Sequence, residues 1–168
     1  MYGKAFLILE TGKIFEGSSL GSVGEVLGEI VFTTGMTGYL ETLTDKSYYG
    51  QIISHTFPLI GNYGVIPEDF ESNTIVAKGY IVKDVCRQPS NFRSQGDLDT
   101  FLKKNRITGL CGIDTRELTI ILREHGTMNG MITDSLEKAD LDRIKSYTVK
   151  NAVKEVSVRE RVVLNQEG

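Results

Sequence analysis

The chain has 168 residues, of which 40% are hydrophobic and 24% are charged, a balance typical of an ordinary soluble domain with one core. Its 19 Lys and Arg against 22 Asp and Glu give a net charge of -3 without a basic run, so we expect no nucleic acid partner. No stretch approaches the ~20 apolar residues of a membrane helix or forms a secretory signal, so we expect no membrane association and a cytoplasmic location.

Strands dominate the first half of the expected structure. A short apolar run at residues 4–9, a turn at residues 10–12 and an alternating segment at residues 13–17 together predict a hairpin. Residues 29–33 and 51–57 are rich in branched side chains and are bounded by glycine-rich segments, a pattern that predicts two buried strands.

A long ordered loop is predicted at residues 58–74, which have no regular period. Loops of this length in a compact domain are usually functional or disordered, so this segment is a candidate for a binding role. Residues 75–85 then return to strand character.

Helices alternate with strands in the second half, which favours parallel pairing because a parallel connection needs a crossover element. Leu98, Phe101 and Leu102 recur at helical spacing in a segment that begins near Asp97. Residues 107–113 follow and predict a buried strand.

A further helix is predicted to begin at Asp114, where Glu117 completes a capping-box-like pair, and to end at Gly126 as its C-cap. Residues 128–133 predict another strand. We expect Ser135 to cap a last helix, which carries the apolar residues Leu136, Ala139, Leu141 and Ile144.

The tail from Asn151 to Gly168 differs from the rest because it mixes valines with alternating charges. A linker cut from a larger protein and a paired edge strand are both compatible with this pattern. We assign residues 1–150 to one domain and residues 151–168 to a linker.

Neither cysteine is predicted to be catalytic. Cys111 lies in the run GLCGI, which resembles a nucleophile elbow, but Ile113 replaces the last glycine and would crowd the strained turn. Cys111 therefore fits an apolar strand as a core residue, and Cys86 has no visible base. The two lack the spacing of a zinc site or a disulfide framework.

The two histidines are predicted to be structural, since a metal site needs at least three convergent ligands. His55 lies in an apolar strand and His125 in the last turn of a helix. We predict no metal site. Five glycines lack phosphate-loop spacing and are expected in turns: Gly21, Gly24, Gly28, Gly35 and Gly38.

Five motifs stand in order along the chain: GEIVFTTGMTGY at 28–39, LTDKSY at 43–48, GNYG at 61–64, SNFR at 90–93 and GIDTRELT at 112–119. In order and spacing they resemble the amino-terminal domain of the small, glutamine-hydrolysing subunit of carbamoyl-phosphate synthetase, over about residues 4–156. The resemblance implies an α/β fold, a three-layer swivelling β/β/α domain with a mixed or parallel central sheet and an antiparallel second sheet.

In that family the small subunit continues into a class I amidotransferase domain, which contains the cysteine nucleophile and its histidine and glutamate partners. The resemblance therefore implies that the present part has no catalytic residue and is inactive alone. Ser47 matches the serine that contacts glutamine, while Lys46 stands where many members have proline.

The whole enzyme of that family makes carbamoyl phosphate from bicarbonate, glutamine and ATP for pyrimidine and arginine synthesis. Its ammonia travels to a large subunit, where the ATP and metal ions are expected, so we expect no cofactor in this chain. The resemblance implies two partners, the large subunit and the amidotransferase domain. Residues 33–39 and 58–74 are candidate docking loops, with Tyr39, Phe57 or Tyr63 as exposed anchors.

Two other functions remain open from the residues. A stand-alone binding or phosphocarrier-like β/β/α module would need His55 or Ser47 to accept a phosphoryl group. A stand-alone thiol hydrolase would need Cys111 as its nucleophile.

Overall fold

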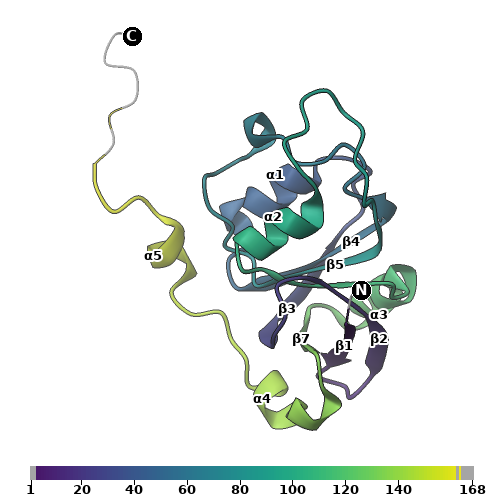
Figure 1. Cartoon of the computed structure of the whole chain (residues 1–168). Helices are drawn as coiled ribbons and strands as arrows, with labels where there is room; N and C mark the ends of the chain where they lie inside the picture. Colours follow the sequence, from purple (N-terminus) through teal and green to yellow (C-terminus); the bar gives the residue numbers. More distant parts are fainter. Residues whose placement is uncertain (1–2, 162, 164–168) are drawn as a thin grey trace.

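The computed structural model describes residues 3–161 and 163 (Figure 1). Strands and helices alternate through most of the chain. The strands are β1 (Lys4–Leu9), β2 (Ile14–Gly21), β3 (Val26–Thr33), β4 (Gln51–Ile60), β5 (Gly79–Val85), β6 (Thr108–Cys111) and β7 (Met128–Thr133). The α-helices are α1 (Tyr39–Thr44), α2 (Leu98–Lys104), α3 (Thr115–His125), α4 (Leu141–Lys145) and α5 (Ala152–Val156), and the 3₁₀ helices are η1 (Lys46–Tyr48), η2 (Pro67–Asp69) and η3 (Leu136–Lys138).

All seven strands belong to one closed sheet in the order β1-β2-β6-β5-β4-β3-β7, and β7 pairs with β1 to complete the barrel. The pairs β3–β4, β4–β5 and β5–β6 are parallel, while the other four pairs are antiparallel. The expected α/β class with a mixed sheet is confirmed. The expected second, antiparallel sheet is absent from the described residues, because the bonds of β2 to β6 and of β3 to β7 join the antiparallel strands to the parallel ones.

The predicted first hairpin is confirmed. Leu7 of β1 pairs with Phe15 of β2, and the turn is closed by the Leu9 N–H, which donates to the Lys13 carbonyl at 2.9 Å. Gly12 has a φ of +88°, a conformation that a side chain would strain.

The two faces of the parallel strands pack into two apolar clusters, because successive side chains of a strand point to opposite faces. Ile53 belongs to the cluster that α1 and α2 cover, with Leu40 and Leu102. Ile52 belongs to the other cluster, with residues of α3 such as Leu118. Figure 1 shows α1 and α2 together on one side of the sheet. Each such side chain contributes about 1.5–3 kcal/mol when it is fully buried.

Several strand boundaries differ from the prediction. β4 continues through Pro58, so the long loop expected at residues 58–74 begins only after Ile60. The pairing of β4 with β5 shifts register between His55 and Leu59, and an irregularity of this kind tolerates a proline that cannot donate to the ladder. β5 begins at Gly79, four residues after the predicted start.

The predicted starts of α2 near Asp97 and of α3 at Asp114 are confirmed, and each of these aspartates caps its helix. The Asp97 carboxylate accepts the Thr100 N–H at 2.9 Å at the start of α2. At the start of α3 the Asp114 carboxylate accepts the Glu117 N–H at 2.9 Å. Gly126, with a φ of +86°, ends α3.

The sequence patterns did not indicate α1, which lies between the expected strands at residues 29–33 and 51–57. The helix has only six residues and starts from Gly38, whose φ of +81° sets the turn into it. Its inner face buries Leu40 and Leu43 completely. So short a helix depends on this packing, because isolated helices of its length are unstable in water.

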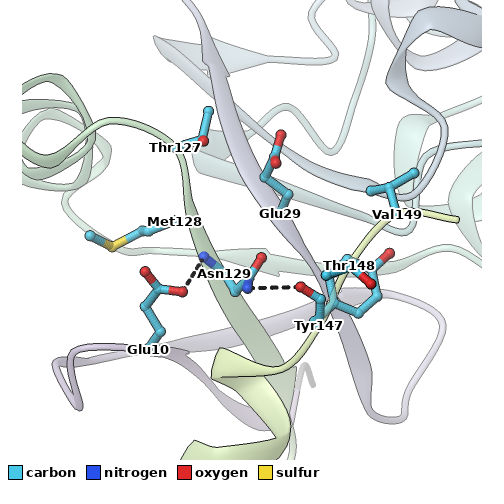
Figure 2. A pocket seen from close by; sticks show the side chains of 8 residues that line it. All are labelled: Glu10, Glu29, Thr127, Met128, Asn129, Tyr147, Thr148 and Val149. Atoms are coloured by element: carbon cyan, nitrogen blue, oxygen red, sulfur yellow. Dashed lines mark hydrogen bonds between the residues drawn. The ribbon is translucent and has the colours of Figure 1, made fainter.

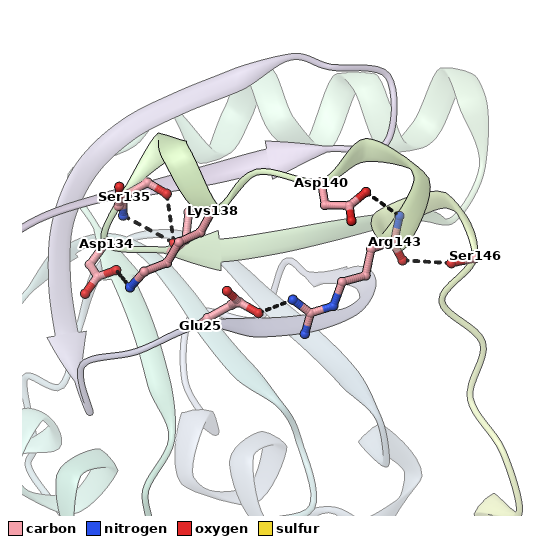
Figure 3. Close-up of polar contacts among 8 residues, drawn as sticks. Glu25, Asp134, Ser135, Lys138, Asp140, Arg143 and Ser146 are labelled. Carbon is pink, nitrogen blue, oxygen red and sulfur yellow. Dashed lines mark hydrogen bonds and ion pairs between the residues drawn. The ribbon is translucent and has the colours of Figure 1, made fainter.

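The single helix expected after Ser135 is wrong, since two short helices occupy the segment. The Ser135 hydroxyl accepts the Glu137 N–H at the start of η3, and Asp140 accepts the Arg143 N–H at 2.9 Å at the start of α4 (Figure 3). Asp140 thus begins a new helix, which the apolar spacing alone did not indicate. An ion pair between Arg143 and Glu25 holds α4 to the segment before β3.

The tail contains α5, which Figure 1 shows clear of the barrel. Val153 and Val158 are 79% and 73% exposed. No strand pairs the tail within residues 151–161 and 163, and the tail positions 162 and 164–168 lie outside the described residues. The linker assignment stays a prediction. Among the described residues, no helix has the length and apolar character needed to cross a membrane.

Candidate functional site

Three of the sequence motifs come together beside the start of α1. The Tyr63 hydroxyl accepts the backbone N–H groups of Gly38 and Tyr39 at 2.9 and 3.3 Å, which joins the turn at 61–64 to the loop at 33–38. The Tyr39 ring stacks on Tyr63 with centroids 4.3 Å apart. The Ser90 N–H donates to the Asn62 carbonyl at 3.0 Å and adds the third motif.

These loops surround a polar hollow of about 250 Å³. One wall holds an ion pair in which Arg93 donates to Asp69 at 3.2 Å. Glu41 lines another side, and its buried Oε2 has no hydrogen-bond partner among the described residues. A buried carboxylate oxygen without a donor is costly, so the hollow suits water or a polar group of a ligand or partner.

Ser47 lies in the middle of η1, directly after α1. The Asp45 carboxylate accepts the Ser47 N–H at 2.8 Å and caps the 3₁₀ helix. The Ser47 side chain is exposed, and its hydroxyl makes no hydrogen bond to any part of the chain that the structure describes. The hydroxyl can therefore both donate to and accept from a ligand. Lys46 occupies the first position of η1 and is exposed.

His55 is a structural residue, as predicted. It is 0% exposed and joins the motif loop to the core: Nε2 bonds the Gly35 carbonyl at 2.8 Å and Nδ1 bonds the Tyr80 hydroxyl at 3.0 Å. A carbonyl only accepts, so Nε2 carries the proton and Nδ1 accepts from Tyr80. Burial lowers the pKa of His55. Both ring nitrogens are thus engaged, which argues against His55 as a phosphoryl acceptor.

Cys111 is a core residue, as the sequence suggested. It ends β6, is 8% exposed, and burial raises the pKa of its thiol, which disfavours the thiolate needed for nucleophilic attack. Cys86 is partly buried. His125 is also structural, since its Nδ1 bonds the Ile121 carbonyl at 3.0 Å in the last turn of α3. No group of three potential metal ligands occurs in the described part of the chain.

The predicted docking anchors need correction. Tyr39 is 0% exposed, because its ring stacks on Tyr63. Tyr63 and Phe57 are both partly buried. The exposed apolar side chains of the motif loops are instead Met36 and Phe92, at 68% and 97% exposure. Phe92 belongs to the SNFR motif, but the sequence around a single aromatic residue does not show whether its side chain is exposed.

The glycines that were expected in turns are not all turn residues. Gly24 and Gly38 have positive φ and lie outside the strands, as expected of turns. Gly21 also has a positive φ but is the last residue of β2, where it pairs with Thr108 of β6. Gly28 instead lies within β3, where a Cβ would come within 2.7 Å of the Ile52 side chain. Close packing of two strands is the reason for glycine at this position.

Comparison with known proteins identifies what the chain is similar to. Residues 7–132 match the family described as carbamoyl-phosphate synthase small chain, CPSase domain. Similar curated proteins are the carbamoyl phosphate synthase small chains of Clostridium perfringens, 50% identical over 98% of this chain and 48% of the relative, and of Listeria monocytogenes, 54% identical over 77% and 36%. That of Bacillus caldolyticus is 46% identical over 96% and 48%. The chain spans about half the length of these relatives, or less.

Proposed function

Because this chain belongs to the carbamoyl-phosphate synthase small-chain family and contains its CPSase domain, we propose that it helps hold glutamine and docks the large subunit. In this proposal the nucleophile that splits glutamine lies on a class I amidotransferase domain, outside the matched residues. The large subunit carries the ATP and metal sites where bicarbonate and the released ammonia become carbamoyl phosphate. In this proposal the chain orients glutamine and helps to shield the released ammonia from water.

The observation that carries the proposal is the exposed hydroxyl of Ser47 on a capped, well-defined turn. Asp45 holds the backbone of η1, so the position from which the Ser47 side chain projects is set before any ligand arrives. A group held in place in advance loses little freedom on binding, which favours the orientation of a small polar substrate. Glutamine offers both donors and acceptors to such a hydroxyl.

Enclosure has a chemical reason. Free ammonia is largely protonated in neutral water and then lacks the lone pair that attacks an acyl group. A covered passage between the two active sites keeps it reactive. The loops around the polar hollow expose Met36 and Phe92, which supply apolar contacts suited to the centre of an interface.

Replacement of Ser47 tests the glutamine role. In the complete small chain assembled with its large subunit, we expect Ser47→Ala to raise the KM for glutamine about tenfold, the effect of one lost hydrogen bond to a charged ligand, and to leave ammonia-dependent synthesis unchanged. Ser157→Ala, also an exposed serine, is the control. Equal loss of glutamine-dependent and ammonia-dependent synthesis in Ser47→Ala would refute the role.

A second experiment tests docking. We expect Phe92→Ala to weaken large-subunit binding by roughly tenfold or more, because truncated aromatic anchors at an interface commonly cost that much. Val23→Ala is a matched control, since Val23 is 72% exposed but lies outside the motif loops. A titration in which Phe92→Ala and Val23→Ala bind the large subunit equally well would remove this surface from the proposal.

A further inference from the structure

The segment of residues 146–149, here called the strap, follows α4 and lies against the end of the turn that contains Ser47. The Tyr147 hydroxyl donates to the Gly50 carbonyl at 2.6 Å, although 97 positions separate the two residues in the sequence. The Tyr147 ring is partly buried. The hydrogen bond therefore connects the carboxyl-terminal part of the domain to the turn that precedes β4.

The strap is itself fixed to the barrel. The Asn129 side-chain amide, on β7, donates to the Tyr147 carbonyl at 3.1 Å, and the Asn129 N–H donates to the Glu10 carboxylate at 3.1 Å (Figure 2). On the other side, the Tyr147 N–H donates to the carbonyl of Ile144, a fully buried residue of α4. The backbone of Tyr147 is thus held by β7 and α4, and its side chain contacts Gly50.

Gly50 is shaped for this contact. Its φ is +80°, and a Cβ at this position would lie 3.0 Å from a Val149 methyl and 3.2 Å from the Tyr147 hydroxyl. Its N–H donates to the Val76 carbonyl at 3.3 Å. Gly50 is therefore held by two hydrogen bonds: its carbonyl accepts from the strap, and its N–H donates to the segment before β5.

We infer that Tyr147 is a positioning residue for Ser47. The turn is fixed at its entrance by the bond of Asp45 to the Ser47 N–H and at its exit by the bond of Tyr147 to Gly50. With both ends held, the backbone of the turn keeps the Ser47 side chain at one position. The inference rests on the proposed role of Ser47 in holding glutamine.

The protonation of Tyr147 is compatible with this task. Burial first, and then the neighbouring Tyr49 and Glu29, raise the pKa of its hydroxyl. The hydroxyl therefore remains a donor to the Gly50 carbonyl throughout the neutral range.

The kinetic test uses Tyr147→Phe in the complete small chain with its large subunit. Loss of one hydrogen bond is expected to raise the KM for glutamine about three- to tenfold, with ammonia-dependent synthesis unchanged. The double variant Ser47→Ala/Tyr147→Phe should be no worse than Ser47→Ala alone, because both act through one hydroxyl. Thr148→Val removes an exposed hydroxyl from the same strap and should have no effect.

Hydrogen exchange on the 168-residue chain tests the positioning without activity. Tyr147→Phe should speed the exchange of the Tyr49 and Gly50 amides about three- to tenfold, and Thr148→Val should not. If Ser47→Ala raises the KM but Tyr147→Phe does not, the inference is overturned and the proposed function stands. If Ser47→Ala has no effect, the proposed function fails, and unchanged exchange in Tyr147→Phe would then overturn the positioning as well.

Discussion

The buried pair of His55 and Tyr80 offers a sharp test of how the motif loop is held. In the variant His55→Leu, the Tyr80 hydroxyl loses its partner inside a fully buried environment, and the Gly35 carbonyl loses a donor. In Tyr80→Phe, Nδ1 of His55 is left without a donor. The two single variants thus create different unsatisfied groups. The double variant removes the Tyr80 hydroxyl and Nδ1 of His55, but the Gly35 carbonyl still lacks its donor.

The expected cost follows from these contacts. An unsatisfied buried hydroxyl costs about 1–3 kcal/mol, and the lost hydrogen bond to Gly35 adds about 1 kcal/mol, so His55→Leu should lower the free energy of unfolding by about 2–4 kcal/mol. For a domain of this size, that is roughly a 5–15 °C lower Tm. The Tyr80→Phe variant should lose about 1–3 kcal/mol.

Denaturant unfolding of four proteins, the unchanged chain, the two single variants and the double variant, measures the coupling free energy between His55 and Tyr80. The double variant His55→Leu/Tyr80→Phe should be more stable than the sum of the single losses predicts, by about 1–2 kcal/mol, because neither the Tyr80 hydroxyl nor Nδ1 of His55 is left unpaired and only the Gly35 carbonyl lacks its donor. Strictly additive losses would show that the hydrogen bond between the two side chains contributes nothing, and the account of the loop anchor would be wrong.

Two further predictions concern stability. Burial lowers the pKa of His55, so below about pH 6.5 the unfolded chain takes up this proton before the folded chain does, and the free energy of unfolding should fall as the pH drops from 7 to 5. Urea titrations across this range should show the fall in His125→Gln but a weaker one in His55→Leu. Gly50→Ala should lose about 1–2 kcal/mol or more, because of its positive φ and the close Val149 methyls, whereas Gly96→Ala, with open space around it, should lose less than 1 kcal/mol in the same assay.

Strong local signals predicted much of the fold. The hairpin of β1 and β2 follows from a regular alternation around Gly12, and α3 follows from the cap at Asp114 and the glycine at 126. In both elements the residues that determine the structure are close to one another in the sequence. The helix α1 was not predicted because its N-cap is Gly38, which has no capping side chain, and because it has only six residues. A helix of this length forms only when it packs against the rest of the domain.

The candidate site was predictable in part. The motifs identify the segments that meet, and the family resemblance identifies Ser47, whose exposure only the structure shows. The contacts that build the site connect distant residues: His55 reaches Gly35 across 20 positions, and Tyr147 reaches Gly50 across 97. No local pattern encodes such pairs. The closure of the sheet likewise depends on β7 pairing with β1, from opposite ends of the domain.

We propose that this chain helps hold glutamine and that the nucleophile that splits it lies on the amidotransferase domain. The most direct measurement is ammonium release from glutamine by the purified 168-residue chain, beside its Cys111→Ala variant. We expect neither protein to release ammonium above the buffer rate, because Cys111 is buried and its pKa is raised. Release by the chain that Cys111→Ala abolishes would contradict the account.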